Sequence, residues 1–184
     1  MLILASASPR RKDLLTQAGI AFTVVPANIP EEQLPKEAAA KFVLRLAEEK
    51  ARAVAKLHPE ATVLAADTIV HLDNEILGKP EDAADAARML RLLSGQTHQV
   101  LTGVAVVEKG VCRSTIEVTQ VTFSKISEED LTHYIASGEP MDKAGAYGIQ
   151  GYAARWIPRI EGDYYNVVGL PVARTIAMLR QAEA

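Results

Sequence analysis

Asp67 is the residue of this chain whose surroundings most clearly indicate chemistry. It interrupts an apolar run in which Val63-Leu64-Ala65-Ala66 precede it and Ile69-Val70 follow. A carboxylate in such a run is costly to bury unless it is paired, hydrogen-bonded or bound to a metal. The pattern therefore favours a metal ligand or a general base, with an aspartate that caps a turn at a strand end as the alternative.

A second polar cluster opens the chain, at Ser6-Ala7-Ser8-Pro9-Arg10-Arg11. Ser8 is a good helix N-cap, and Pro9 suits the first helical position, where a missing N–H costs nothing. The two serines project to the same side of the extended segment, and the two arginines fall in the first helical turn. Because cations there oppose the helix dipole, they weaken the helix unless an anion binds between them. The junction predicts a phosphate site, with a capped helix and two solvated arginines as the alternative.

Two lysines stand where their side chains have a defined direction. Lys50 continues an i,i+4 apolar series that runs through Leu46 and Val54, so we expect it to point inward. Lys79 precedes Pro80, which restricts it to an extended conformation. A solvated surface lysine is the alternative at both positions.

A glycine-rich loop holds a further candidate, in the segment Asp142-Lys143-Ala144-Gly145-Ala146-Tyr147-Gly148-Ile149-Gln150-Gly151. Its three glycines permit positive φ or close approach of the backbone. Gln150 offers an amide donor beside an acceptor, which complements the edge of uracil or thymine, where N3–H lies beside carbonyl oxygens. A structural loop with an exposed glutamine is the alternative.

The composition limits the classes of function. A net charge of −3 over 184 residues argues against a broad nucleic-acid surface, although a local basic pocket could still bind a small anion. The single cysteine, Cys112, excludes an intramolecular disulfide and a thiolate metal cluster, and we expect a buried, inert thiol. His98 is expected to be a hydrogen-bonded structural histidine, because no second histidine lies at metal-ligand spacing. With neither a signal peptide nor a membrane span in the sequence, we expect a cytoplasmic protein without a membrane or nucleic-acid partner.

Hydrophobic periodicity predicts the elements that position these residues, in a mixed α/β protein that forms one domain or two lobes sharing a sheet. The predicted strands cover 2–5, 21–25, 62–72, 76–77, 99–107 and 111–123. The predicted helices cover 9–18, 36–57, 83–93 and 127–136, with a closing helix from Pro171 and a last hairpin around Gly162-Asp163. The almost continuous apolar run of 62–72 suits a strand covered on both faces.

In chain order, six segments resemble the Maf family of septum-formation-inhibitor-like nucleoside triphosphate pyrophosphatases. They are residues 6–11, 65–68, 78–80, 94–98, 143–151 and 169–171. The resemblance implies an elongated α/β fold of the inosine-triphosphatase type, with a mixed central sheet flanked by helices. It also implies a single domain, 1–184, whose two lobes share the sheet and enclose a deep nucleotide-binding cleft. The implied reaction cleaves a nucleoside triphosphate to the monophosphate and pyrophosphate.

Arg10, Thr68 and Gln150 match the three base-selecting positions of the family branch that acts on dTTP and UTP. The branch that acts on 7-methyl-GTP carries different residues there, including an acidic one in place of the glutamine. An acidic side chain suits the donor edge of guanine, whereas Gln150 suits the mixed edge of a pyrimidine.

The resemblance further implies a metal-assisted hydrolysis. Asp67 is the implied proton acceptor for the water that attacks the α-phosphorus, and Asp67 with Glu31 would hold Mg²⁺ or Mn²⁺. The loop before Glu31 departs from the family pattern, because Asn28 and Pro30 stand where another acidic residue is common. The implied phosphate-binding residues are Ser6, Ser8, Arg10, Arg11, Lys50 and Lys79.

Two other functions fit the same residues. One is the same chemistry on a modified purine nucleotide such as 7-methyl-GTP, and the other is a non-catalytic, nucleotide-responsive regulator of cell division. The sequence leaves open the oligomeric state, a homodimer included, the preferred metal, and whether the protein cleanses nucleotide pools or controls division.

Overall fold

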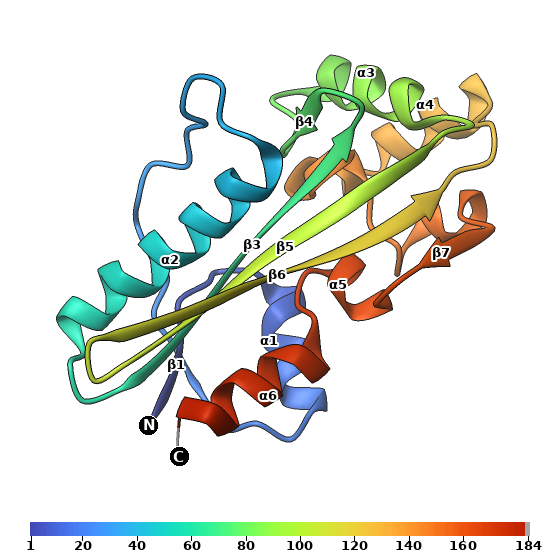
Figure 1. The fold of residues 1–184 in the computed structure, drawn as a ribbon. Helices are drawn as coiled ribbons and strands as arrows, with labels where there is room; N and C mark the ends of the chain where they lie inside the picture. Colours follow the sequence, from blue (N-terminus) through green and yellow to red (C-terminus); the bar gives the residue numbers. More distant parts are fainter. Residues whose placement is uncertain (183–184) are drawn as a thin grey trace. The chain divides into compact units, whose positions relative to one another are not determined.

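The computed structural model describes residues 1–182 as a mixed α/β protein. Its strands form one sheet in the order β2-β1-β3-β5-β6-β7, with β4 paired to β3 (Figure 1). The strands are β1 (Leu2–Leu4), β2 (Thr23–Val24), β3 (Thr62–Leu72), β4 (Glu75–Leu77), β5 (Thr97–Glu108), β6 (Val111–Thr122) and β7 (Arg159–Glu161). β1 pairs in parallel with β2 and β3, whereas β4 and β7 pair antiparallel with β3 and β6. The mixed sheet confirms the predicted α/β class.

Within the described residues, six α-helices and three short 3₁₀ helices accompany the sheet. The α-helices are α1 (Pro9–Gln17), α2 (Ala39–Leu57), α3 (Ala83–Leu93), α4 (Glu128–Ala136), α5 (Tyr164–Val168) and α6 (Val172–Ala182). The 3₁₀ helices are η1 (Glu139–Asp142), η2 (Ala144–Ala146) and η3 (Tyr152–Trp156). Among residues 1–182, none of these helices has both the length and the apolar character that a membrane crossing requires.

The chain divides into two compact units. Unit 1 comprises residues 1–68, 102–117 and 169–182, and unit 2 comprises residues 69–101 and 118–168. Strands β3, β5 and β6 contribute residues to both units. The prediction that the whole chain is one domain around a cleft stays a prediction.

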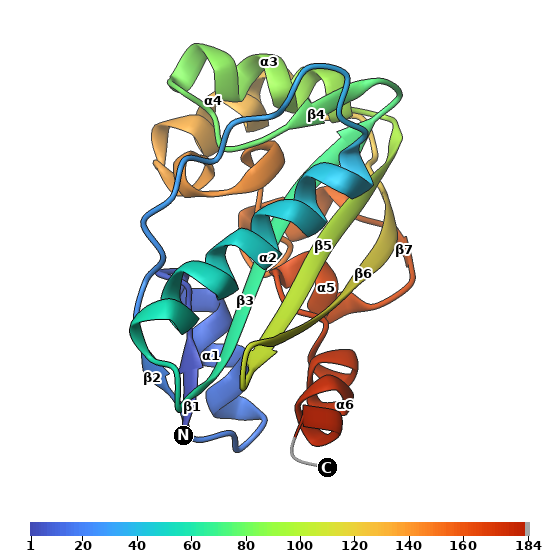
Figure 2. The same cartoon turned by 60° about the vertical axis from the view of Figure 1, so that its left-hand side comes forward.

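The core of unit 1 forms where α2 covers the strands (Figure 2). Odd-numbered strand residues face this helix, because side chains alternate between the two faces of a strand. They and the helix contribute the buried residues Ile3, Ala5, Val63, Ala65, Ala105, Val107, Ala47, Ala51 and Val54. A Cβ added at Gly103 of β5 would lie 2.4 Å from the carbonyl oxygen of Val43, so only glycine lets α2 approach the strand this closely.

The core of unit 2 is rich in aromatic rings. Phe123 and Tyr147 meet edge to face with their ring centroids 4.8 Å apart, and Tyr134 and Trp156 do so at 5.3 Å. Edge-to-face contacts of this kind add to the gain from burying apolar area. Buried residues of α3 and α4 belong to the same core, among them Leu90 and Leu93.

Several predicted boundaries hold. β3 and α3 have the predicted limits, and the closing helix begins directly after Pro171. β5 and β6 are joined by Lys109 and Gly110, which both have positive φ (48° and 79°), as the tight primed hairpin turns require.

Three features differ from the prediction. α2 starts at Ala39 instead of residue 36, because Lys36 has a φ of 59° and the Glu37 side chain accepts the N–H of Leu34 in a turn. The loop 138–151 contains two of the short 3₁₀ helices, which are too short to produce a periodic pattern of apolar residues. The hairpin predicted around Gly162-Asp163 is wrong: Asp163 Oδ1 accepts the N–H groups of Tyr165 and Asn166, which starts α5 instead of a return strand.

Candidate active site

Strand alternation at the end of the unit 1 part of β3 sends two neighbouring polar residues to opposite faces. Asp67 continues the odd-numbered series of Val63 and Ala65, which faces α2. Thr68 faces the other way and contacts Arg11 of α1. One strand therefore supplies a carboxylate to one face and a hydroxyl to the other.

Lys50 of α2 holds Asp67 and Glu31 together. Its Nζ lies 2.6 Å from Asp67 Oδ1 and 2.6 Å from Glu31 Oε1. The side chains of Lys50 and Asp67 are only 9% and 10% exposed, whereas that of Glu31 is 51% exposed. The inward direction predicted for Lys50 is confirmed. The ion pair with Lys50 explains how the Asp67 carboxylate can be buried within an apolar run.

This arrangement also brings together the two carboxylates that the family resemblance implies as metal ligands. Each has one oxygen at the same distance from a single cationic nitrogen. In the part of the chain from residue 1 to 182, no group of three or more His, Cys, Asp or Glu side chains is placed to hold a metal ion. The protein donors that could contribute to a metal here are therefore two carboxylates.

The N-terminal junction has the predicted cap. Ser8 Oγ accepts the N–H of Arg11 at 3.5 Å, and Pro9 occupies the first position of α1. Ser6 Oγ accepts the N–H of Ser8 at 3.2 Å. The first turn of α1 contains no acidic residue, so its positive end carries no side-chain counter-charge from the helix itself.

Arg11 is more deeply buried than a solvated arginine would be. Its Nε donates to the carbonyl of Gly169 at 2.8 Å, Nη1 to Ser6 Oγ at 3.1 Å, and Nη2 to Thr68 Oγ1 at 3.0 Å. Burial lowers the pKa of Arg11, and the carboxylate of Asp67 opposes that shift. Three of the five guanidinium N–H groups thus donate to groups within the protein.

Thr68 belongs to a network that the sequence did not reveal. Its hydroxyl lies 2.9 Å from that of Thr102, which is fully buried on β5. Thr102 gave no signal in the sequence, because a threonine inside a strand is ordinary. Arg10, which lies between Pro9 and Arg11 in the first turn of α1, is half-buried, and its charge adds to the lowering of the Arg11 pKa.

In unit 2, the segments that carry Lys79 and Gln150 are joined by their backbones. Gly145 N–H donates to the carbonyl of Gly78 at 3.0 Å. Gly145 has a φ of 68°, and a Cβ there would lie 2.7 Å from Val70 Cγ2, so the loop requires glycine at this position. Lys79 and Gln150 are both exposed on these linked loops.

His98 is a structural residue, as predicted. It is 1% exposed, packs against Phe123, and its Nε2 lies 2.7 Å from the hydroxyl of Tyr147. Burial lowers the pKa of His98 to about 4, so the ring is neutral at physiological pH. Cys112 is half-buried instead of buried, and desolvation raises the pKa of its thiol, which keeps it protonated and unreactive.

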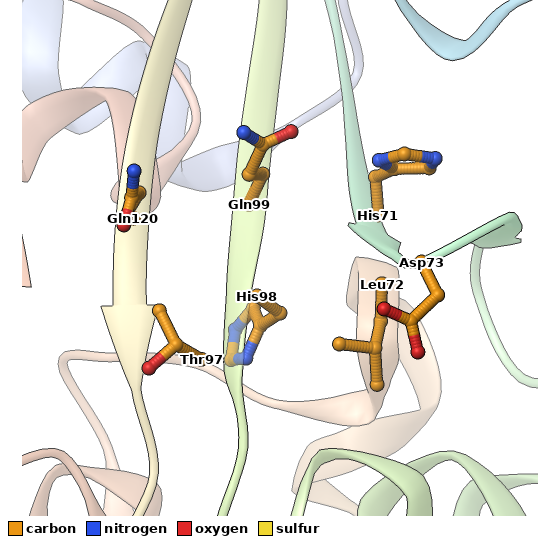
Figure 3. A pocket seen from close by; sticks show the side chains of 7 residues that line it. All are labelled: His71, Leu72, Asp73, Thr97, His98, Gln99 and Gln120. Atoms are coloured by element: carbon orange, nitrogen blue, oxygen red, sulfur yellow. The ribbon is translucent and has the colours of Figure 1, made fainter.

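Unit 2 also has a hollow of about 300 Å³ (Figure 3). Thr97, Gln99, Gln120, His71 and Asp73 line it from β3, β5, β6 and the turn after β3. None of the predicted site residues is among the residues that line it.

Comparison with known proteins identifies the family. The model of the Maf family, described as Maf-like protein, matches residues 1–182. The chain is 55% identical to a dTTP/UTP pyrophosphatase of Koribacter versatilis, over 98% of this chain and 94% of that protein. It is 52% identical to proteins of the same name from Bacillus cytotoxicus (99% and 95% covered) and Salmonella typhimurium (100% and 93% covered).

A solved structure supports the fold independently. The HAM1 protein of Coxiella burnetii superposes with a TM-score of 0.57 and 17% identity over 98% of both chains. At that identity the likeness concerns the fold alone. The match to the family model and the identities above 50% over nearly the full length confirm the predicted resemblance: this chain belongs to the Maf family.

Proposed function

We propose that the protein hydrolyses dTTP and UTP to the nucleoside monophosphate and pyrophosphate. The observation that carries the proposal is the buried Lys50–Asp67 pair with Glu31 at its half-exposed side. Both carboxylates lie near enough to Arg11, in the first turn of α1, to raise its pKa against the effect of burial. The substrates are taken from relatives at 52–55% identity, which are named dTTP/UTP pyrophosphatases. The matching residues Arg10, Thr68 and Gln150 support the same branch.

Asp67 is the proposed proton acceptor. Because Oδ1 is taken up by Lys50, Oδ2 is the oxygen that would accept the proton of a water. The water oxygen attacks the α-phosphorus, the bond from that phosphorus to the α–β bridging oxygen breaks, and pyrophosphate leaves. Lys50 keeps the carboxylate in one orientation throughout.

The negative charge that develops on the phosphates would be met by cations and N–H groups. Arg10, Arg11 and Lys50 supply charge in unit 1, and the serine hydroxyls with the first N–H groups of α1 supply hydrogen bonds. The resemblance adds Lys79, which lies in unit 2, to the residues proposed to bind phosphate. Preorganised donors of this kind provide most of the acceleration in phosphoryl chemistry.

A divalent cation, Mg²⁺ or Mn²⁺, fits the donor set. Lys50 Nζ occupies the point where one oxygen each of Asp67 and Glu31 converge, so the cation would use the remaining oxygens of these two carboxylates, which are ligands that such hard cations prefer. Magnesium commonly binds through one or two carboxylates together with substrate phosphates and water, so two protein ligands suffice. When bound, such a cation neutralises phosphate charge and lowers the pKa of bound water.

Product analysis tests the proposal. The purified protein is incubated with Mg²⁺ or Mn²⁺ and, separately, dTTP, UTP, CTP, GTP and 7-methyl-GTP. We expect monophosphate and pyrophosphate from dTTP and UTP. Turnover of 7-methyl-GTP alone would assign the other family branch, and tight binding of intact triphosphate without any product would favour the regulator of cell division.

A further inference from the structure

The turn that carries Gln150 is closed by a hydrogen bond of its own. The N–H of Gly151 donates to the carbonyl of Gly148 at 3.1 Å, which makes residues 148–151 a β-turn with Gln150 at the third position. Gln150 is exposed at this tip, whereas Ile149 beside it is buried. The direction of the Gln150 side chain therefore depends on what fixes the two ends of the turn.

Tyr134 and Glu139 fix both ends. The N–H of Gly148 donates to the hydroxyl oxygen of Tyr134 at 3.3 Å, and that hydroxyl donates to Glu139 Oε1 at 3.1 Å. The other carboxylate oxygen, Oε2, accepts the N–H of Tyr152 at 3.4 Å, directly after the turn. One carboxylate thus contacts the start of the turn through a phenol and its end directly.

The hydrogen bonds from Gly148 through Tyr134 to Glu139, which form a relay, run in one defined direction. A carboxylate only accepts, so Tyr134 must donate to it and can then accept from Gly148. Tyr134 is fully buried, and burial together with the nearby Glu139 charge raises the pKa of its phenol. The phenol therefore keeps its proton, and the relay keeps this direction, throughout the range in which the protein would act.

Glycine at the end of the turn makes room for the carboxylate. A Cβ added at Gly151 would lie 1.9 Å from Glu139 Oε1 and 2.6 Å from its Cδ. Lys143 holds the other side of Glu139, because its Nζ donates to the Glu139 backbone carbonyl at 2.6 Å. Lys143 therefore holds the backbone of Glu139, while Gly151 lies against its carboxylate.

We propose that Glu139 is a positioning residue for base recognition, which acts through Tyr134 and the 148–151 turn to aim Gln150 at a pyrimidine base. The side-chain amide of Gln150 can rotate to present its donor or its acceptor. Its contribution to base binding therefore depends on how firmly the backbone of the 148–151 turn is held. This inference rests on the proposed function, and neither Glu139 nor Tyr134 touches the phosphates in it.

The experiment compares UTP with ribose 5-triphosphate, which has the same sugar and phosphates but no base. The ratio of the two kcat/KM values measures what the base contributes. In Glu139→Gln we expect this ratio to fall about tenfold, the effect of weakening one charged hydrogen-bond network. Hydrolysis of ribose 5-triphosphate should stay within about twofold of the wild-type rate, because the phosphate machinery is untouched. Glu129→Gln, an exposed carboxylate of α4, is the matched control and should leave the ratio unchanged.

Two further variants separate positioning from general structural support. Gly151→Ala displaces the Glu139 carboxylate without altering its charge and should lower the ratio similarly. In a Gln150→Ala background, Glu139→Gln should have no additional effect on the ratio, since the group that it positions is gone.

Three results distinguish the failures. If the wild-type protein releases no pyrophosphate from UTP, the proposed function is wrong. If it does, but Glu139→Gln lowers the rates on both substrates equally, Glu139 only supports the fold and the inference is wrong. A full tenfold loss that persists in the Gln150→Ala background would also overturn it, because the effect would then not pass through Gln150.

Discussion

Lys50 and His98 are both buried polar side chains, and the two units of the molecule stabilise them in opposite ways. Lys50 in unit 1 is charged and lies 2.6 Å from each of two carboxylates. His98 in unit 2 is neutral, lies among aromatic rings, and makes its hydrogen bond through Nε2. Within residues 1–182 its Nδ1 has no hydrogen-bond partner. A buried charge needs a counter-charge, whereas a neutral ring can be held by packing.

The difference shows why a shifted pKa alone does not identify a site. The pKa of His98 is lowered to about 4, but burial is its only cause and no charged partner contributes. The Lys50 cluster combines opposite charges with a side chain, Glu31, that is half-exposed. A site needs both charge and access, and the unit 1 cluster has both.

Neutralising Asp67, the buried carboxylate of unit 1, is the change with the largest expected effect on this comparison. Asp67→Asn keeps the shape of the side chain but removes the proposed proton acceptor, so we expect kcat for dTTP to fall by about two to four orders of magnitude. Steady-state release of pyrophosphate measures it, with the unfolding temperature as a check on folding. Full activity in this variant would contradict the assignment of Asp67.

Removing the positive charge of Lys50 should have the next largest effect. Lys50→Met fills similar volume but leaves Asp67 without its ion-pair partner, so we expect about 3 kcal/mol lower unfolding free energy. The loss of one preorganised charge should also lower kcat by about two orders of magnitude. Urea unfolding and pyrophosphate release measure the two effects.

A double mutant sharpens this result. If the cost of Lys50→Met comes from an unpaired carboxylate, it should shrink in an Asp67→Asn background, where no charge remains on that residue. An equal loss of stability in both backgrounds would show that packing of the lysine stem, and not the ion pair, stabilises this region.

The lowered pKa of His98 in unit 2 predicts that the free energy of unfolding depends on pH. The ring has a pKa of about 4 in the folded protein and about 6.5 when unfolded, so the unfolded state binds a proton first as the pH falls. The stability is therefore complete above pH 6.5 and declines towards pH 4. Between pH 7.5 and 5 we expect a loss of about 2 kcal/mol from this residue.

Urea unfolding at the two pH values measures that loss in the wild type and in His98→Gln. The variant has no titrating ring, so its own pH dependence should be smaller by the same amount. His133→Gln, at an exposed histidine of α4, is the matched control and should keep the wild-type slope. An identical pH slope in wild type and His98→Gln would show that the ring is already charged or accessible.

Much of this architecture could be predicted because local rules determine it. The apolar run of β3, the Ser8-Pro9 cap of α1 and the turn at Lys109-Gly110 each follow from side chains within a few residues. The inward direction of Lys50 could be predicted from the periodicity of its own helix. In each case the signal and the structure lie in the same segment.

The features that could not be predicted depend on contacts distant in the sequence. Arg11 donates to Gly169, which is 158 residues away, and the Thr68–Thr102 contact joins two strands. From the sequence, Glu139 is one more acidic residue in a loop, because its contacts with Tyr134 and Tyr152 join separate segments of the chain. The direct partnership of Lys50 with both carboxylates was missed for the same reason, since each residue was assigned separately to phosphate or metal.

The smallest effect in the comparison concerns the neutral hydroxyl pair of unit 1. Thr102→Val has nearly the same shape but takes from Thr68 Oγ1 a partner at 2.9 Å, while Arg11 Nη2 still donates to it. A neutral hydrogen bond of this kind contributes about 1 kcal/mol, so the unfolding free energy should fall by about that much, well below the loss in Lys50→Met. Thr102→Ser keeps the hydroxyl and should recover part of the difference. Urea unfolding measures both, and a loss as large as that of Lys50→Met would mean that Thr68 and Thr102 share in the charge network of Arg11 instead of forming a neutral pair beside it.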